Sequence, residues 1–173
     1  MTNCLIVSDT HGDLHTLRSL LRAQSGLDAL IFLGDGLKEV EELASEGWLP
    51  PVLSVRGNCD SATSPLGYPR DEELTLALCG HRILLLHGHT ASVKSGYEGL
   101  LSLARARDAD IVLFGHTHTP FSTYLPSERG GPLWLFNPGS LGRPTEGGRG
   151  FGTLTLDARG GVLLSHGVWE GRA

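Results

Sequence analysis

The sequence predicts an α/β fold in which two mixed β-sheets pack together and helices cover them on the outside. Over residues 4–55, apolar runs of strand length alternate with segments that have helical periodicity. A β-hairpin pattern follows over residues 73–86, and short β-like runs separated by Gly and Pro fill the last third. Strands that alternate with helices favour a parallel sheet with right-handed crossovers, whereas consecutive short strands favour antiparallel pairing.

The first part of the chain has the order β-α-β-α-β. Uninterrupted apolar residues mark its strands, and leucines or valines three or four positions apart mark its helices. Asp13 is an expected N-cap for the first helix. The expected elements are strands at 4–8, 29–33 and 52–55 and helices at 13–24 and 37–46.

The pattern changes after residue 60. Residues 61–72 are rich in Pro, Gly and Ser and are expected to form a loop. Gly80-His81 is expected to be the tight turn of a hairpin. The remaining expected elements are strands at 73–79, 82–86, 110–114, 121–125, 133–136, 151–156 and 162–166 and a helix at 96–107. The last third of the chain is therefore expected to be antiparallel.

The composition indicates one domain and argues against several classes of protein. The 173 residues, 40% of them hydrophobic, are enough for one core, so a single domain over 1–173 is expected. A net charge of −5 without a Lys/Arg block argues against binding to extended nucleic acid. No apolar stretch approaches the roughly 18 residues of a membrane span. Three widely spaced cysteines and the lack of a signal-peptide pattern predict a cytoplasmic protein.

Five polar clusters stand at the ends of apolar runs, where strands would deliver them to one edge of the sheets. They are Asp9-Thr10-His11, Gly34-Asp35, Gly57-Asn58-Cys59-Asp60, His87-Gly88-His89 and Gly115-His116-Thr117-His118. Two carboxylates, one carboxamide and four imidazoles form the candidate ligand set for divalent metal ions. Its members are Asp9, His11, Asp35, Asn58, His87, His116 and His118. Two ions about 3.5–4 Å apart and bridged by a carboxylate would use all seven.

Six motifs together resemble the calcineurin-like metallophosphoesterase superfamily, and most closely its small bacterial and archaeal phosphodiesterase branch. They are SDTHG (8–12), LGDG (33–36), VRGNCD (55–60), LLHGH (85–89), FGHTH (114–118) and FNPGS (136–140). The resemblance runs from residue 5 to about residue 144 and implies a four-layer α/β/β/α sandwich. It assigns one metal to Asp9, His11, Asp35 and His118, and a second to Asp35, Asn58, His87 and His116. Manganese is the usual ion in such sites; iron, nickel, zinc and magnesium remain open.

The third cluster departs from the pattern of the family. Many relatives carry His after the metal-binding Asn, in the role of proton donor to the leaving group, whereas this chain has Cys59. A thiol is a poorer donor in that position, so substrates with good leaving groups should suffer least. His89 is the expected local replacement. Asp60 is expected either to orient a ligand or bound water in catalysis or to cap a turn. Asn137-Pro138-Gly139-Ser140 is expected to be a turn that supports the metal loops.

The resemblance implies a binuclear metal-dependent phosphodiesterase, with in-line attack on phosphorus by a metal-bridging hydroxide. The expected substrate is a small phosphoester, because no cap domain or large insertion is apparent. Two alternatives stay open: a phosphomonoesterase on the same site, and a protein-interaction scaffold on the same fold, as one eukaryotic trafficking subunit of this branch is thought to be. A scaffold would be expected to lose ligands, and all seven positions here hold competent ones. A homo-oligomer is also open.

Overall fold

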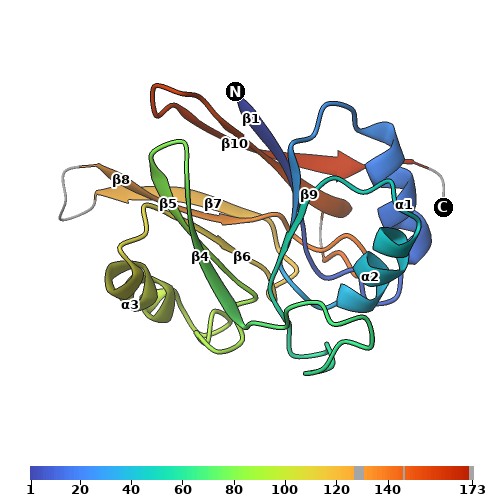
Figure 1. Cartoon of the computed structure of the whole chain (residues 1–173). Coiled ribbons are helices and arrows are strands. Elements are labelled where there is room, and N and C mark those ends of the chain that lie inside the picture. Colours follow the sequence, from blue (N-terminus) through green and yellow to red (C-terminus); the bar gives the residue numbers. More distant parts are fainter. Residues whose placement is uncertain (127–130, 146, 172–173) are drawn as a thin grey trace.

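The structure is a computed structural model that describes residues 1–126, 131–145 and 147–171. Within these ranges it contains two five-stranded β-sheets and three helices (Figure 1). The strands are β1 (Thr2–Val7), β2 (Ala29–Phe32), β3 (Val52–Ser54), β4 (Glu73–Leu78), β5 (His81–Leu86), β6 (Ile111–Phe114), β7 (Phe121–Pro126), β8 (Pro132–Asn137), β9 (Arg149–Leu156) and β10 (Val162–Trp169). The helices are α1 (Leu14–Ala23), α2 (Leu37–Ser45) and α3 (Glu98–Arg107). Every expected strand and helix is present, with ends shifted by a few residues.

Both sheets are mixed, as predicted. The first has the order β10-β9-β1-β2-β3, with β1, β2 and β3 parallel and β9 and β10 added in antiparallel hairpin fashion. The second has the order β4-β5-β6-β8-β7, with β5, β6 and β8 parallel and antiparallel strands β4 and β7 at its edges. The expectation of an antiparallel last third is correct for β7–β8 and β9–β10. It is wrong for the other neighbour of β8. This strand lies between β7 and β6, and its pairing with β6 is parallel.

The hairpin turn between β4 and β5 lies one residue earlier than expected. Its two residues are Cys79 and Gly80, with φ of 51° and 85°, and His81 already belongs to β5. A two-residue hairpin turn with positive φ at both positions twists in the sense of the flanking strands. That backbone match, and not the identity of the residue after Gly80, sets the register of the hairpin.

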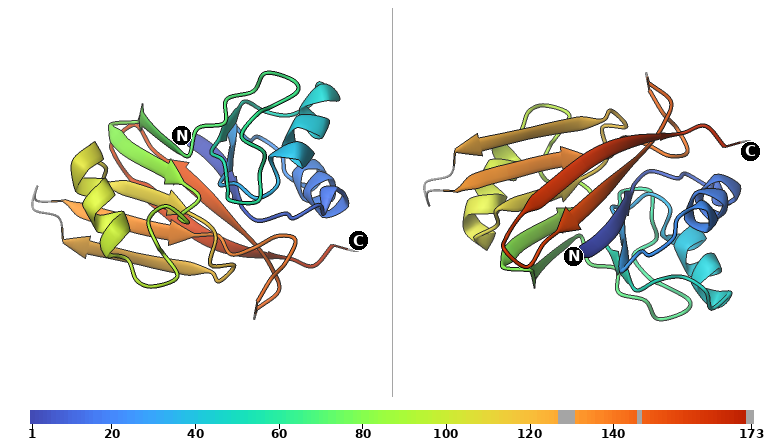
Figure 2. Two further views of the ribbon diagram at one scale, coloured as in Figure 1. Left: turned by 90° about the horizontal axis from the view of Figure 1, so that it is seen from below. Right: turned by 90° about the horizontal axis from the view of Figure 1, so that it is seen from above.

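Alternate residues of the central strands face different layers, because successive side chains of a strand point to opposite sides. Ile6 and Leu85 belong to a buried cluster between the two sheets. Leu5 packs in a second cluster with α1 and α2, and Leu84 packs in a third with α3. Figure 2 shows α1 and α2 beside one sheet and α3 beside the other. This is the predicted four-layer α/β/β/α sandwich. Each fully buried leucine or isoleucine contributes about 1.5–3 kcal/mol to it.

The loops that follow β1, β2, β5 and β6 meet at one edge of the sandwich.

The N-cap prediction for α1 is confirmed, since the Asp13 carboxylate accepts a hydrogen bond from Thr16 N at 3.0 Å. The 61–72 segment contains no regular helix or strand, as expected. Of the helices in the described ranges, none combines the length and apolar character needed to cross a bilayer.

Candidate metal centre

The backbone is strained at most of the candidate ligands. Five of them have positive φ: Asp9 (57°), His11 (46°), Asp35 (57°), His116 (68°) and His118 (61°). This conformation costs roughly 1–3 kcal/mol for a residue other than glycine, and such residues concentrate at functional sites. Backbone hydrogen bonds hold the first two loops in register, from Asp9 N to Gly34 O and from His11 N to Asp35 O, both at 3.0 Å. The fold thus fixes sharp turns where the ligand side chains leave the strands.

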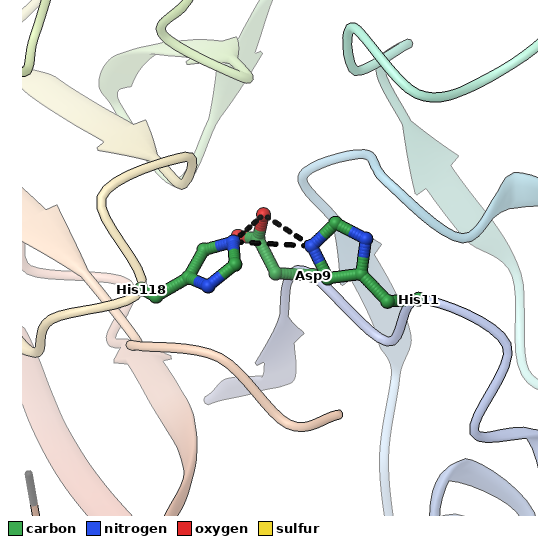
Figure 3. Close-up of side chains that lie close together, drawn as sticks. All are labelled: Asp9, His11 and His118. Carbon is green, nitrogen blue, oxygen red and sulfur yellow. Dashed lines mark hydrogen bonds and ion pairs between the residues drawn. The ribbon is translucent and has the colours of Figure 1, made fainter. Parts of the chain in front are cut away.

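Three candidate ligands converge on one point (Figure 3). His118 Nε2 lies 3.1 Å from Asp9 Oδ1 and 3.1 Å from His11 Nε2. His11 Nε2 lies 3.7 Å from the same Asp9 oxygen. Metal–ligand bonds of about 2.0–2.2 Å hold neighbouring ligand atoms roughly 3.0–3.6 Å apart. The trio therefore has the spacing of ligands that share one ion.

Asp35 lies between this trio and His87. Its Oδ2 atom is 3.8 Å from His11 Nε2 and 3.4 Å from His87 Nε2. His87 Nδ1 lies 2.7 Å from Leu33 O, so the neutral ring carries its proton on Nδ1 and turns the Nε2 lone pair toward the carboxylates. Asp9 Oδ1 and His87 Nε2 are buried 3.9 Å apart, and neither has a hydrogen-bond partner among the described residues. Buried polar atoms are almost always satisfied, so this pair is suited to binding a cation.

The last two candidate ligands, His116 and Asn58, have fewer contacts that tie their side chains to the other candidates. The His116 ring is centred 5.0 Å from the His87 ring, and His116 N donates to Asp9 Oδ2 at 3.1 Å. Asn58 is exposed, and its Nδ2 donates to Cys59 Sγ at 3.3 Å. The structure therefore brings six of the seven residues into one cluster. It leaves Asn58 beside that cluster, and among the described residues its carboxamide forms no hydrogen bond with the other six.

The electrostatics favour the metal-binding forms of Asp35 and His116 but not that of His87. Burial raises the pKa of Asp35, but the nearby His87 ring and the amide of Cys59 outweigh it and bring that pKa well below its usual range. Burial, with the positive charges of His87 and Lys94, lowers the pKa of His116 to about 4. Burial also lowers the pKa of His87, but the neighbouring carboxylates raise it by more. Metal binding needs ionised carboxylates and neutral imidazoles, so an ion would displace a proton chiefly from His87.

Asp60 supports the second loop through its carboxylate. The two oxygens accept four backbone N–H groups: Asp35 and Gly57 on Oδ2 at 2.7 and 2.9 Å, and Gly36 and Leu37 on Oδ1 at 2.8 and 2.9 Å. These bonds cap the start of α2, where Gly36 provides no side-chain cap. Of the two roles expected for Asp60, the contacts correspond to turn capping, so Asp60 is a positioning residue for Asp35.

Replacing Asp60 with alanine should lower the free energy of unfolding by about 2–4 kcal/mol, because four backbone amides lose a charged acceptor. Urea unfolding of the metal-free protein measures this change. Activity should fall too, since the Asp35 amide loses its anchor, so stability is the deciding measurement. An Asp60→Ala protein that is as stable as the parent but inactive would return Asp60 to the catalytic role.

His89 lies at the rim of the cluster. It is half-buried, its ring is centred 6.1 Å from that of His116, and its Nε2 is 4.0 Å from Glu72 Oε1. Glu72 is also paired with Arg56. His89 Nδ1 is buried and has no hydrogen-bond partner among the described residues. The ring therefore lies beside the candidate ligands, with Nε2 facing Glu72 and Nδ1 buried.

One supporting residue, Glu39, could not be recognised from the sequence. Glu39 of α2 reads as a surface charge, yet it is buried, and its Oε1 accepts from Thr10 Oγ1 at 2.8 Å and from Gly12 N at 2.6 Å. It anchors the loop that carries Asp9 and His11. The only signal was an acidic residue in the first turn of a helix that starts next to a ligand cluster.

The turn at 137–140 supports the metal loops, as expected. Asn137 is fully buried, and its Nδ2 donates to Gly115 O at 2.8 Å and to Thr117 Oγ1 at 3.1 Å. Ser140 Oγ donates to Asp9 O at 2.8 Å. The turn after β8 thus joins the loop after β6 to the loop after β1, and these two strands belong to different sheets.

Fold and site together define a metal-dependent hydrolase built on two packed mixed sheets, with a His/Asp centre at one edge. The chain belongs to the calcineurin-like phosphoesterase superfamily, whose domain model matches residues 2–159.

Individual relatives agree with this membership. The chain is 32% identical over 187 residues to "Phosphodiesterase YfcE" of Escherichia coli K12, with 95% of this chain and 94% of that protein covered. It is 34% identical over 143 residues to "Probable metallophosphoesterase YsnB" of Bacillus subtilis 168, with 82% and 76% covered. The crystal structure of Vps29 from Entamoeba histolytica complexed with Zn²⁺ superposes with a TM-score of 0.69, covering 95% and 98% of the chains. At 19% identity this last likeness shows the shared fold alone.

Proposed function

We propose that the protein is a binuclear metal-dependent phosphodiesterase that acts on a small phosphoester. The observation that carries the proposal is the buried pair of Asp9 Oδ1 and His87 Nε2, which have no hydrogen-bond partner among the described residues and are flanked by Asp35. An uncompensated set of this kind destabilises a protein unless a cation completes it. The name of the YfcE relative, which is similar over almost its whole length, supports a diester as the substrate.

The residues divide between two ions. In the proposal, Asp9, His11, Asp35 and His118 hold one ion, and Asp35, Asn58, His87 and His116 hold the other. The mixed nitrogen and oxygen ligands suit manganese, iron, nickel, zinc or magnesium. When bound, the two ions supply Lewis acidity that lowers the pKa of a water and neutralises phosphoryl oxygens.

In the proposal, Asp35 positions the metal ions and His89 positions the substrate. Asp35 is held by the amide of Cys59 through Oδ1, which leaves Oδ2 directed at the two histidines. His89 is proposed to contact the phosphoryl group, because its half-buried ring borders the centre beside His116. Three free cysteines fit a reducing compartment, so a cytoplasmic location is part of the proposal.

The test compares a bis-aryl phosphodiester with the matching aryl phosphomonoester, using purified protein whose metal content is measured and which is supplemented with Mn²⁺. We expect the diester to be hydrolysed with the higher kcat/KM. A higher value for the monoester would establish the phosphomonoesterase alternative. If two ions bind and neither ester is hydrolysed, the scaffold alternative replaces the proposed activity.

Replacing Cys59 with histidine should help diesters with poor leaving groups most, because an imidazolium can protonate the departing oxygen better than a thiol. The measurement is kcat/KM for wild type and Cys59→His across aryl diesters of increasing leaving-group pKa. We expect the dependence on leaving-group pKa to become shallower, with a gain of roughly tenfold or more for the poorest leaving group. Equal gains for all substrates would refute a proton-donor effect.

A further inference from the structure

A groove of about 530 Å³ runs along β3, between α2 and the segment that joins β3 to β4 (Figure 1). Its volume is within the range of roughly 300–1,000 Å³ that is usual for binding pockets. The described residues that line it include none of the seven candidate metal ligands. Val40 and Leu49 connect its wall to the apolar cluster beneath α1 and α2, and Leu53 and Leu74 connect it to the cluster between the sheets. The groove therefore has apolar walls on both faces of β3 and lies outside the metal centre.

Arg70 lines this groove and has a buried donor without an acceptor. Its side chain is only 8% exposed, and its Nη2 pairs with Glu41 of α2, which is also buried. Arg70 Nε is buried and has no hydrogen-bond partner among the described residues. Buried N–H groups are almost always satisfied, so this atom indicates that a bound molecule supplies an acceptor.

The charges around Arg70 define that acceptor. Glu41 already balances the guanidinium charge, and Asp71 adds a second acidic side chain to the lining of the groove. A carboxylate from the ligand would leave excess negative charge in a partly buried site, which is costly. The neutral oxygen of a carbonyl group adds no charge and can accept from Nε. The groove therefore favours an uncharged ligand that contains carbonyl groups.

β3 presents an open backbone edge to the same groove. It is the last strand of its sheet, and β2 is its only neighbour among the described strands. Pro51 O and Val55 N form hydrogen bonds with β2, at 2.9 and 3.0 Å. Such groups alternate along a parallel ladder, so the N–H and C=O groups of Val52 and Ser54 point to the open side. Both residues line the groove, and a row of donors and acceptors of this kind pairs readily with another strand.

We propose that the groove binds an extended, uncharged peptide segment of a partner protein, which adds to the sheet as a strand beside β3. The peptide backbone pairs with Val52 and Ser54, one of its carbonyl oxygens accepts from Arg70 Nε, and its apolar side chains contact the walls. A small molecule with one carbonyl group would satisfy Arg70 but not the edge of β3, so a peptide fits all three features. The inference goes beyond the proposed function and does not depend on it.

The test is selection of short linear peptides from a random display library on the full-length protein, followed by affinity measurements on the enriched peptides. We expect these peptides to alternate apolar and polar residues. Arg70→Lys, which keeps a cation for Glu41 but lacks Nε, should bind them at least roughly tenfold more weakly. Arg18→Lys is the matched control, because Arg18 pairs with Glu46 at the surface and does not line the groove, and its affinity should equal that of wild type.

A second pair of variants locates the peptide. Ala44 of α2 lines the groove, and Ser45 is the next residue of the helix, exposed and outside the lining. Ala44→Trp should fill the groove and abolish binding, whereas Ser45→Trp should bind like wild type, with circular dichroism showing that both are folded. N-methylation along the peptide backbone should block binding at every second residue, because only alternate N–H groups face β3.

Three results would overturn the inference. They are a wild-type protein that enriches no peptide, peptides that still bind Ala44→Trp, and N-methylation effects without a two-residue period. Unchanged affinity in Arg70→Lys would remove Arg70 from the site and refute the inference as well.

Discussion

Replacing Asp35 with asparagine should remove most of the bound metal and most of the activity. Asp35 Oδ2 lies 3.8 Å from His11 Nε2 and 3.4 Å from His87 Nε2, so it is placed to bridge two ions. A carboxamide of the same shape has no charge and only one oxygen to offer. We expect kcat/KM for a diester to fall at least roughly a thousandfold, equivalent to about 4 kcal/mol.

The same variant should keep its fold. The hydrogen bond from Cys59 N to the side-chain oxygen at position 35 survives in an asparagine, and its side chain has the same size. Metal content by plasma mass spectrometry should fall from two ions to one or fewer. Asp157→Asn is the matched control, because Asp157 is a half-exposed residue that binds the β9–β10 turn, away from the centre. Turnover near that of wild type in Asp35→Asn, with two ions bound, would overturn the assignment of Asp35.

The candidate ligands could be predicted because their signal is local. Each follows an apolar run directly, and the ends of parallel strands in one sheet share an edge, so residue type and position suffice. Asp9 and His118 illustrate this: they are far apart in sequence, and in the structure His118 Nε2 lies 3.1 Å from Asp9 Oδ1.

The supporting contacts could not be predicted because their partners are set by packing. The carboxylate of Asp60 accepts bonds from residues more than twenty positions earlier, at the start of α2. That geometry depends on how closely the loops after β2 and β3 approach each other. The parallel pairing of β8 with β6 escapes prediction for a similar reason. A short strand carries no local mark of which neighbour it will join, and two antiparallel hairpins suggest a simpler order than the one observed.

The loops after β2 and β3 approach each other closely at Gly57, which leads to a second large effect. A Cβ atom on Gly57 would lie 2.1 Å from Asp35 Oδ1 and 2.5 Å from Asp35 N. Both atoms are already fixed, the first by Cys59 N and the second by Asp60 Oδ2. Replacing Gly57 with alanine must therefore push the Asp35 loop away from its position.

We expect Gly57→Ala to lose at least roughly a hundredfold in kcat/KM, because displacement of a positioned group by about 1 Å can have that effect. Overpacking should also lower the free energy of unfolding by about 1–3 kcal/mol. Gly131→Ala is the control, since a Cβ there meets no atom of the described residues within 4 Å and its φ is not positive, so both quantities should stay near wild type. The two measurements together decide the interpretation. A folded Gly57→Ala protein with reduced metal content and activity supports Gly57 as the spacer that lets Asp35 reach both ions. Unchanged metal binding and turnover would mean that the loop relaxes freely, and the contact between these loops would then have no part in placing the ligand.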